Sequence, residues 1–267
     1  MSDVDAFAEF ALELADAGRP IARRAFESTS DFVSKPDGTP VTEIDQAIEK
    51  LLADQISTSF PDHGILGEEY GSRDVGNEYV WVIDPIDGTK SFATGLPTFG
   101  ILISLCRDGL PILGIIDLPI AQQRCVGVEG RISEFNGSPV RCRPRSNVSE
   151  CVMSASGPEF YKGTAPRTGF EQLWPKTKWN VYGSGCAAYA QLARGLIDLC
   201  LEGNNLSPFD FCALVPIVNG AGGKISDWYG NDLNLRSGVD IKADGVLASG
   251  NPEVHDQALE ILNGKQH

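Results

Sequence analysis

The segment "WVIDPIDGTKSF" (81–92) constrains the fold more than any other part of the sequence. Its apolar, β-rich start predicts a buried strand that ends in Asp84 and Asp87. The proline between these acids fixes φ, and Gly88 permits a tight turn from which a helix can start. Carboxylates bind hard cations such as Mg²⁺, while the free N–H groups of a helix that starts at Gly88 and Thr89 can bind phosphate oxygens. The segment therefore predicts a metal-assisted phosphate site.

A lone D-x-x-D pattern more often caps a helix or shapes a turn, but the full run Asp-Pro-Ile-Asp-Gly-Thr is far more specific. Two further places in the sequence carry acids in similar positions. Glu68 and Glu69 end another apolar run, and Asp210 in "SPFDF" starts a predicted helix. Taken singly, Glu68 is typical of a surface acid and Asp210 of a helix cap. Together with the strand-end aspartates they predict one acidic cleft.

The charge balance limits the choice of partner. The chain of 267 residues has 22 basic and 36 acidic side chains, a formal charge of -14, which disfavours nucleic acid as a partner. An anionic substrate then requires a cation that the sequence does not encode, and metal ions would supply it. No apolar run approaches the ~18 residues of a membrane span, and the acidic first residues do not resemble a signal peptide. We therefore expect a cytoplasmic protein without a membrane partner.

The cysteines give a weak signal for either a disulfide framework or a zinc site. They are odd in number, widely spaced and without a C-x-x-C pair, and the chain has only three histidines. Because most of them lie among apolar residues, we expect buried, small apolar side chains. The positions are Cys106, Cys125, Cys142, Cys151, Cys186, Cys200 and Cys212.

The order of the predicted elements indicates a layered α/β fold, with sheets between helices. Helical spacing runs through 7–26, and a second helix is predicted from Asp45 to just before Pro61. Short β-rich runs follow, and strands and helices alternate again after about Ser149. We expect two halves, 1–148 and 149–267, that form one continuous catalytic unit. The most loop-like region, 157–180, is predicted to be the hinge between them.

These motifs together resemble the inositol monophosphatase superfamily of magnesium-dependent, lithium-sensitive phosphomonoesterases. "GEE", "DPIDGT" and the aspartate followed by "ALVPIVNGAGGKISDW" stand in the family's order and spacing, and the resemblance runs from Lys35 to about Asn251. It implies an αβαβα sandwich with two or three Mg²⁺ ions in each site, or Mn²⁺ in their place. The implied metal ligands are Glu68, Asp84, the Ile86 carbonyl, Asp87 and Asp210.

The resemblance also implies the catalytic residues. Thr89 and Asp45 correspond to the pair that activates water, with Glu68 as a further catalytic acid, and Gly88 and Thr89 would bind phosphate. The family's mechanism is in-line attack on phosphorus by metal-activated water, without a phosphoenzyme. Lys35 is a possible further site residue, although it is equally typical of a solvated loop lysine, and Glu69 is another possible one.

Within the superfamily, "TKSF" and the pattern after Asp210 are more similar to the histidinol-phosphatase branch, which acts in histidine biosynthesis. Glu202 would suit the cationic amine of histidinol phosphate, with Gly185 and Cys186 as further substrate contacts. However, "GSGCAAYA" lacks the acid and tyrosine of that branch's G-x-D-C-Y run, and "EGNNLSPFD" places Glu202 one residue further from Asp210 than expected.

Other functions stay open at this stage. The substrate could instead be inositol 1-phosphate or a sugar or nucleotide phosphate, and a non-catalytic metal-binding module is a remote alternative. The family also implies a homodimer, for which the apolar 99–120 segment is the predicted contact region.

Overall fold

The computed structural model describes residues 3–28, 33–34, 40–41, 43–203 and 205–264. Two helices cover one face of the larger sheet, as the helical spacing predicted: α1 (Asp3–Glu27) and α2 (Glu43–Ser59). α1 continues through Gly18 and Pro20 as one helix. A β-carbon at Gly18 would lie 2.9 Å from Cδ1 of Ile101, so glycine lets α1 approach the sheet closely at this point.

The larger sheet has eight strands in the order β10-β9-β8-β7-β6-β5-β3-β4. Within it, β5 pairs parallel with β3 and antiparallel with β6. A hairpin turn at Asp108 and Gly109 joins β6 to β7, with positive φ at both residues. The strands are β3 (Gly64–Gly67), β4 (Ser72–Arg73), β5 (Tyr79–Asp87), β6 (Gly100–Arg107), β7 (Leu110–Leu118), β8 (Gln123–Val128), β9 (Glu134–Phe135) and β10 (Ser138–Pro139). A separate short pair consists of β1 (Val33–Ser34) and β2 (Pro40–Val41).

The smaller sheet has five strands in the order β12-β11-β13-β15-β14. These are β11 (Val152–Ala155), β12 (Trp179–Tyr182), β13 (Leu199–Glu202), β14 (Lys224–Ser226) and β15 (Val246–Ser249). The remaining α-helices are α3 (Thr89–Ala93), α4 (Thr164–Leu173), α5 (Cys186–Ala193), α6 (Pro208–Phe211), α7 (Leu214–Gly220) and α8 (Pro252–Leu262). Three short 3₁₀ turns are η1 (Val148–Glu150), η2 (Pro158–Phe160) and η3 (Trp174–Lys176).

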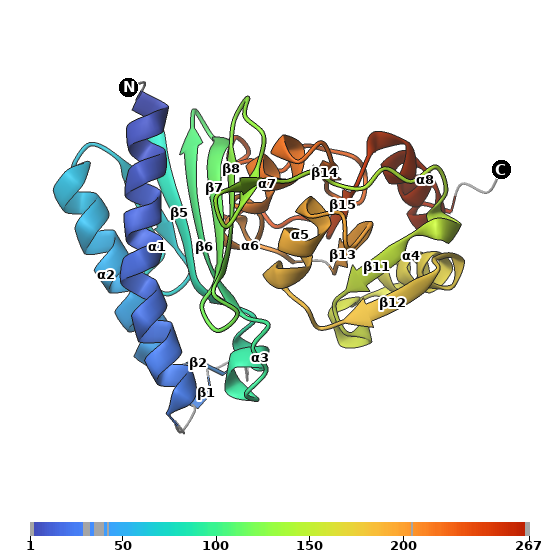
Figure 1. Cartoon of the computed structure of the whole chain (residues 1–267), viewed down its shortest axis with the longest axis horizontal. Coiled ribbons are helices and arrows are strands. Elements are labelled where there is room, and N and C mark those ends of the chain that lie inside the picture. Colours follow the sequence, from blue (N-terminus) through green and yellow to red (C-terminus); the bar gives the residue numbers. More distant parts are fainter. Residues whose placement is uncertain (1–2, 29–32, 35–39, 42, 204, 265–267) are drawn as a thin grey trace.

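Strand alternation explains the layers, because successive side chains of a strand enter opposite cores. In β6, Ile101 and Ile103 pack with α1 and α2, while Leu102 belongs to the core that includes α5 and α7. In β13, Cys200 belongs to that same central core, whereas Leu199 faces α4 and α8. The result is the αβαβα sandwich that the family resemblance implied, with α5, α6 and α7 between the two sheets (Figure 1).

Two expectations about local structure were wrong. The 157–180 region is not a hinge between halves: it contains η2, α4 and η3 and leads into β12, and α4 packs against α8 inside the C-terminal layer. The 99–120 segment is not an exposed contact surface, because β6 and β7 are interior strands of the larger sheet with helices on both faces. Its apolar side chains are already buried within the chain.

All seven cysteines are buried, as expected for small apolar side chains. None of the described helices is both long enough and apolar enough to cross a membrane.

Candidate active site

The acids of the central motif meet at the end of β5 because the strand is irregular there. Asp84 pairs with Leu102 and Asp87 with Gly100, so β5 has one residue more than β6 across this interval. In a regular strand, side chains three residues apart would point to opposite faces, and a bulge of one residue brings them to the same side. The N–H of Ile86 donates to Oδ1 of Asp84 at 3.0 Å, which fixes the turn.

Directly after β5 the chain enters α3, as the sequence predicted. Gly88 has the left-handed conformation, with φ 86° and ψ 40°, which glycine adopts without the steric cost of a β-carbon. Oγ1 of Thr89 donates to the carbonyl oxygen of Ile86 at 3.3 Å. The expected pairing of Thr89 with Asp45 to activate water stays a prediction.

Asp210 comes to the same place from α6. Its Oδ2 accepts a hydrogen bond from the N–H of Ser207 at 2.6 Å, and the Ser207 side chain completes a capping box. One carboxylate oxygen each from Asp84, Asp87 and Asp210 lie within 4.8 Å of one another. Asp210 is therefore both a helix cap and a member of an acidic cluster, which the sequence presented as alternatives.

Glu68 and Asp45 lie close enough to this cluster for their charges to act on Asp84. Glu68 directly follows β3, the parallel neighbour of β5, and Asp45 is buried in the first turn of α2. The predicted members of the site therefore converge from β3, β5, α2 and α6. Lys35 lies outside the described residues.

Glu49 is a residue that the sequence analysis missed. Its side chain is buried, with only 1% exposed, and its two carboxylate oxygens accept the N–H groups of Glu69 at 2.8 Å and Tyr70 at 2.9 Å. A β-carbon on Gly67 would lie only 2.0 Å from Oε1 of Glu49. Glu49 thus holds the backbone directly after Glu68 and packs closely against Gly67 before it. Its position four residues after Asp45, on the same face of α2, was the available signal.

The electrostatics of the cluster favour a bound cation. Burial raises the pKa of Asp84 well above its usual range, and the charges of Glu68, Asp87 and Asp210 raise it further. Burial also raises the pKa of Asp87 and raises that of Asp210 to about 8. Like charges this close cannot all ionise without a counter-charge. An oxygen-rich set of this kind fits Mg²⁺ or Mn²⁺.

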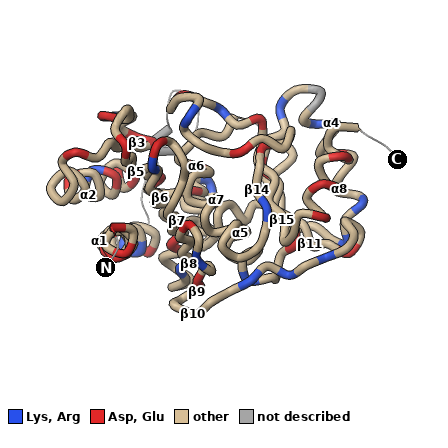
Figure 2. The backbone as a smooth tube through the Cα atoms, turned by 90° about the horizontal axis from the view of Figure 1, so that it is seen from above, with Lys and Arg blue, Asp and Glu red and all other residues tan. Residues whose placement is uncertain are grey.

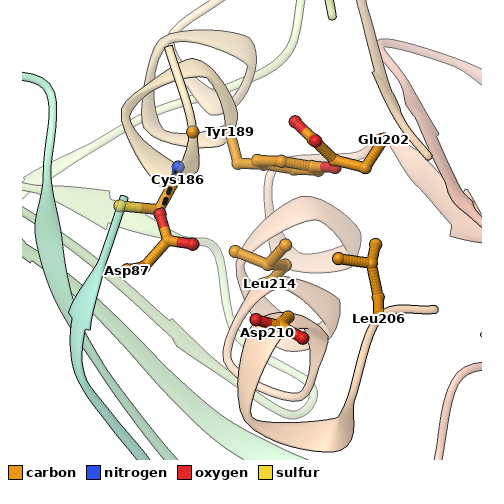
Figure 3. Close-up of a pocket in the computed structure, with 8 residues that line it drawn as sticks. Asp87, Cys186, Tyr189, Glu202, Leu206, Asp210 and Leu214 are labelled. Carbon is orange, nitrogen blue, oxygen red and sulfur yellow. Dashed lines mark hydrogen bonds between the residues drawn. The ribbon is translucent and has the colours of Figure 1, made fainter. Parts of the chain in front are cut away.

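A cavity opens beside the cluster, and Figure 3 shows the residues that line it: Asp87, Gly185, Cys186, Tyr189, Glu202, Leu206, Asp210 and Leu214. The N–H of Cys186 donates to Oδ2 of Asp87 at 2.8 Å. Gly185 has φ 48°, and a β-carbon there would lie 3.0 Å from the same Oδ2. Gly185 stands where the histidinol-phosphatase branch has an acid. A side chain at this position would press on Asp87, a proposed metal ligand.

Glu202 enters the cavity from the end of β13, where the Ser156 hydroxyl donates to its carboxylate. Burial, together with the charge of Asp87, raises the pKa of Glu202 to about 7. The structure thus brings the predicted substrate contacts Glu202, Gly185 and Cys186 into one cavity with two of the proposed metal ligands. Tyr189, which also lines this cavity, was not expected from the sequence.

Known proteins share this pattern over nearly the whole chain. The profile of the Inositol monophosphatase family matches residues 3–267. The "Bifunctional phosphatase IMPL2, chloroplastic" of Arabidopsis thaliana is 41% identical over 265 residues, which are 98% of this chain and 76% of the plant protein. Histidinol-phosphatase of Mycobacterium tuberculosis is 32% identical over 260 residues, 95% of this chain and 96% of that protein.

Solved structures of known proteins also share this fold. An inositol monophosphatase from Zymomonas mobilis superposes with a TM-score of 0.87 at 34% sequence identity, and the match covers 98% of this chain and 99% of that one. The chain is thus similar both to proteins named histidinol-phosphatase and to proteins named inositol monophosphatase.

Proposed function

The chain belongs to the inositol monophosphatase family and is a phosphoric monoester hydrolase, and on that premise we propose that it converts histidinol phosphate to histidinol and inorganic phosphate. One observation carries the choice of substrate: the Glu202 carboxylate lines the same cavity as Asp87 and Asp210. A phosphate held beside the acidic cluster would place an amine of the leaving group within reach of this carboxylate, which favours a cation.

The proposed cofactor is Mg²⁺, with two or three ions in the site and Mn²⁺ as a substitute. The proposed ligands are Glu68, Asp84, the Ile86 carbonyl, Asp87 and Asp210. When bound, the ions supply positive charge to the phosphate oxygens and lower the pKa of water. The crowding of buried carboxylates in the cluster supports this proposal, because it leaves them short of counter-charge.

The chain's own groups then have separate roles. Thr89 uses its proton in the bond to the Ile86 carbonyl, so its oxygen keeps lone pairs that can accept a hydrogen bond from the attacking water and orient it. Asp45, buried in α2, is proposed to act with Thr89, and Glu68 is proposed as a further catalytic acid. The first N–H groups of α3, at Gly88 and Thr89, have no acceptor within the helix and are proposed to bind phosphate.

A second substrate class is favoured by a specific observation. The solved structure from Zymomonas mobilis is called an inositol monophosphatase and matches the chain almost completely. Inositol 1-phosphate is therefore the alternative substrate, since Glu202 can also accept hydrogen bonds from hydroxyl groups; other sugar or nucleotide phosphates come after it. We further propose that the enzyme is inhibited by Li⁺, forms a homodimer and works in the cytoplasm.

Phosphate release from a panel of esters tests the proposal. Purified protein with Mg²⁺ should hydrolyse histidinol phosphate with the highest kcat/KM, and added Li⁺ should lower the rate. The panel contains inositol 1-phosphate, a sugar phosphate and a nucleotide phosphate. If histidinol phosphate is turned over no faster than these, the proposed substrate is wrong, while the hydrolase activity of the family stands.

A further inference from the structure

The hydroxyl of Tyr189 is a buried polar group without a hydrogen-bond partner among the described residues. Its side chain is only 1% exposed, in α5 between the two sheets. A buried hydroxyl that loses its bonds to water and gains none destabilises the fold, so such groups are rare in native proteins. Since Tyr189 also lines the cavity beside the acidic cluster, the missing partner points to a bound ligand.

The cavity has two ends of different chemistry. Asp87 and Asp210 lie at one end, and the Glu202 carboxylate lies at the other. In Figure 3 the ring of Tyr189 lies between Glu202 on one side and Leu214 and Leu206 on the other. A ligand that fills this space therefore meets carboxylates first, then an apolar wall, then a carboxylate and a phenolic hydroxyl together.

This order of surfaces discriminates between leaving groups. A polyol carries hydroxyl groups around its whole ring, and those against Leu206 and Leu214 would lose their bonds to water without replacement. A flat ring can lie against the leucine side chains and the Tyr189 ring, with its nitrogen atoms at the polar end. A cationic or N–H nitrogen suits the Glu202 carboxylate, and the Tyr189 hydroxyl can donate to or accept from a second polar atom.

We propose that Tyr189 is a specificity-determining residue whose hydroxyl bonds the leaving group, and that this subsite takes the phosphate ester of an amino alcohol with a flat nitrogen-containing ring. The inference rests on the proposed function and deepens it. It assigns to the Tyr189 hydroxyl a role in substrate choice, separate from the chemistry at the acidic cluster.

Tyr189→Phe is the direct test, because it removes one oxygen and keeps the ring. The specificity readout is kcat/KM for histidinol phosphate relative to phenyl phosphate, whose leaving group has a flat ring but no nitrogen. We expect this ratio to fall about tenfold, the size of one lost hydrogen bond. The stability readout is the melting temperature of the ligand-free protein, which should stay equal or rise, because an unpaired buried hydroxyl has been removed.

Tyr161→Phe is the matched control. Tyr161 is also buried, but its hydroxyl donates to the carbonyl of Leu201 at 3.0 Å. Loss of this bond should lower the melting temperature. If Tyr189→Phe lowers the melting temperature as Tyr161→Phe does, the Tyr189 hydroxyl has a structural partner and the inference is overturned.

The outcomes separate this inference from the proposed function. If wild-type protein prefers histidinol phosphate and Tyr189→Phe leaves the ratio unchanged, the role of Tyr189 is overturned and the proposed substrate stands. If wild-type protein prefers inositol 1-phosphate, the proposed substrate and the ring class both fail. In that case the role of Tyr189 in substrate choice is supported only if Tyr189→Phe shifts the relative rates across the panel, and is overturned if it does not.

Discussion

Two sets of buried aspartates in this molecule differ in their partners, and the difference identifies the working part of the fold. Asp117 and Asp198 are fully buried and each is bound by arginine side chains. Asp84, equally buried at 2% exposure, has other carboxylates around it. A buried charge without an opposite charge is strongly unfavourable, so a cation that the chain does not provide would stabilise the ionised form of the second set.

Asp117, the first of the two arginine-bound acids, ties α1 to the larger sheet. Asp117 on β7 accepts Nε of Arg19 from α1 at 2.9 Å and Nε of Arg124 from β8 at 2.6 Å. Arg124 also reaches Asp16 on α1 at 2.7 Å. The acid charge is balanced within the chain, and this cluster needs no ligand.

Asp198, the second arginine-bound acid, lies where the chain passes from the larger sheet to the smaller one. Asp198 accepts two parallel hydrogen bonds from Arg143, both 2.8 Å, and a further one from Arg145 at 3.2 Å. These arginines belong to the connection between β10 and β11, where Figure 2 shows basic positions along the tube. The N–H of Val152 also donates to Asp198, which joins this connection to the start of the smaller sheet.

Replacing one aspartate of each set by asparagine should affect different properties: activity for the acid of the site, and stability for the arginine-bound acid. The larger effect is expected at the site: Asp87→Asn keeps an acceptor for the N–H of Cys186 but removes a charge from the proposed metal ligands. We expect kcat/KM to fall about a thousandfold, as for loss of several kcal/mol of metal-dependent stabilisation. Phosphate release measures the loss, and a melting curve without metal should show no decrease in stability.

Asp198→Asn is the counterpart. It removes the charge to which two arginines bind, and we expect the free energy of unfolding to fall by about 3 kcal/mol. Denaturant titration measures this change. At a temperature where the variant is folded, kcat should stay close to that of wild type. If Asp198→Asn abolishes activity in fully folded protein, the distinction between the two sets fails.

The positions of the site residues along the chain could be predicted from the sequence, but the partners of the arginine-bound acids could not. Asp84, Asp87 and Asp210 stand in continuous motifs whose spacing already predicts a strand end and a helix start. The arginine partners of Asp198 lie more than fifty positions away in sequence, and no local pattern connects them. Tertiary contacts, which periodicity does not encode, decide such pairs.

The errors of sequence interpretation have similar physical causes. The 157–180 region was predicted to be a hinge because it is the most loop-like part of the sequence, yet α4 forms there and packs on α8. Glu49 was not singled out in the sequence, and only the fold shows the backbone N–H groups that it binds. Tyr189 was indistinguishable from an ordinary core residue of α5.

Glu49 provides an intermediate test, since it supports the acidic cluster without belonging to it. Glu49→Gln keeps the shape but offers one carbonyl oxygen where two oxygens accepted the N–H groups of Glu69 and Tyr70. We expect the Mg²⁺ concentration for half-maximal activity to rise about tenfold, as for other residues that orient metal ligands. Direct Mg²⁺ binding by calorimetry is the second readout. An unchanged Mg²⁺ affinity would show that Glu49 does not position Glu68.

The smallest expected effect is a dependence of stability on pH in metal-free protein. The folded pKa of Asp210 is about 8, against an ordinary value of 3.8. Its contribution to stability is therefore fully present below the lower value and is lost as the pH rises through about 8. For this group we expect the melting temperature of metal-free protein to fall steadily from pH 5 to pH 8.

Two comparisons isolate that contribution. Asp210→Asn cannot ionise, so its metal-free melting temperature should fall less over the same pH range. Saturating Mg²⁺ should abolish the fall in wild type, because it binds the ionised form. A wild-type protein whose melting temperature rises from pH 5 to pH 8 without metal would contradict the raised pKa.

Calorimetric titration of metal-free protein with Mg²⁺ shows whether a divalent cation balances the buried acids at the end of β5. Titrations near pH 7 in two buffers of different ionisation heat also count the protons released. We predict saturable binding with proton release, and Asp84→Asn and Asp210→Asn should both weaken the binding. Absence of saturable binding, or equal affinity in wild type and both variants, would contradict the account.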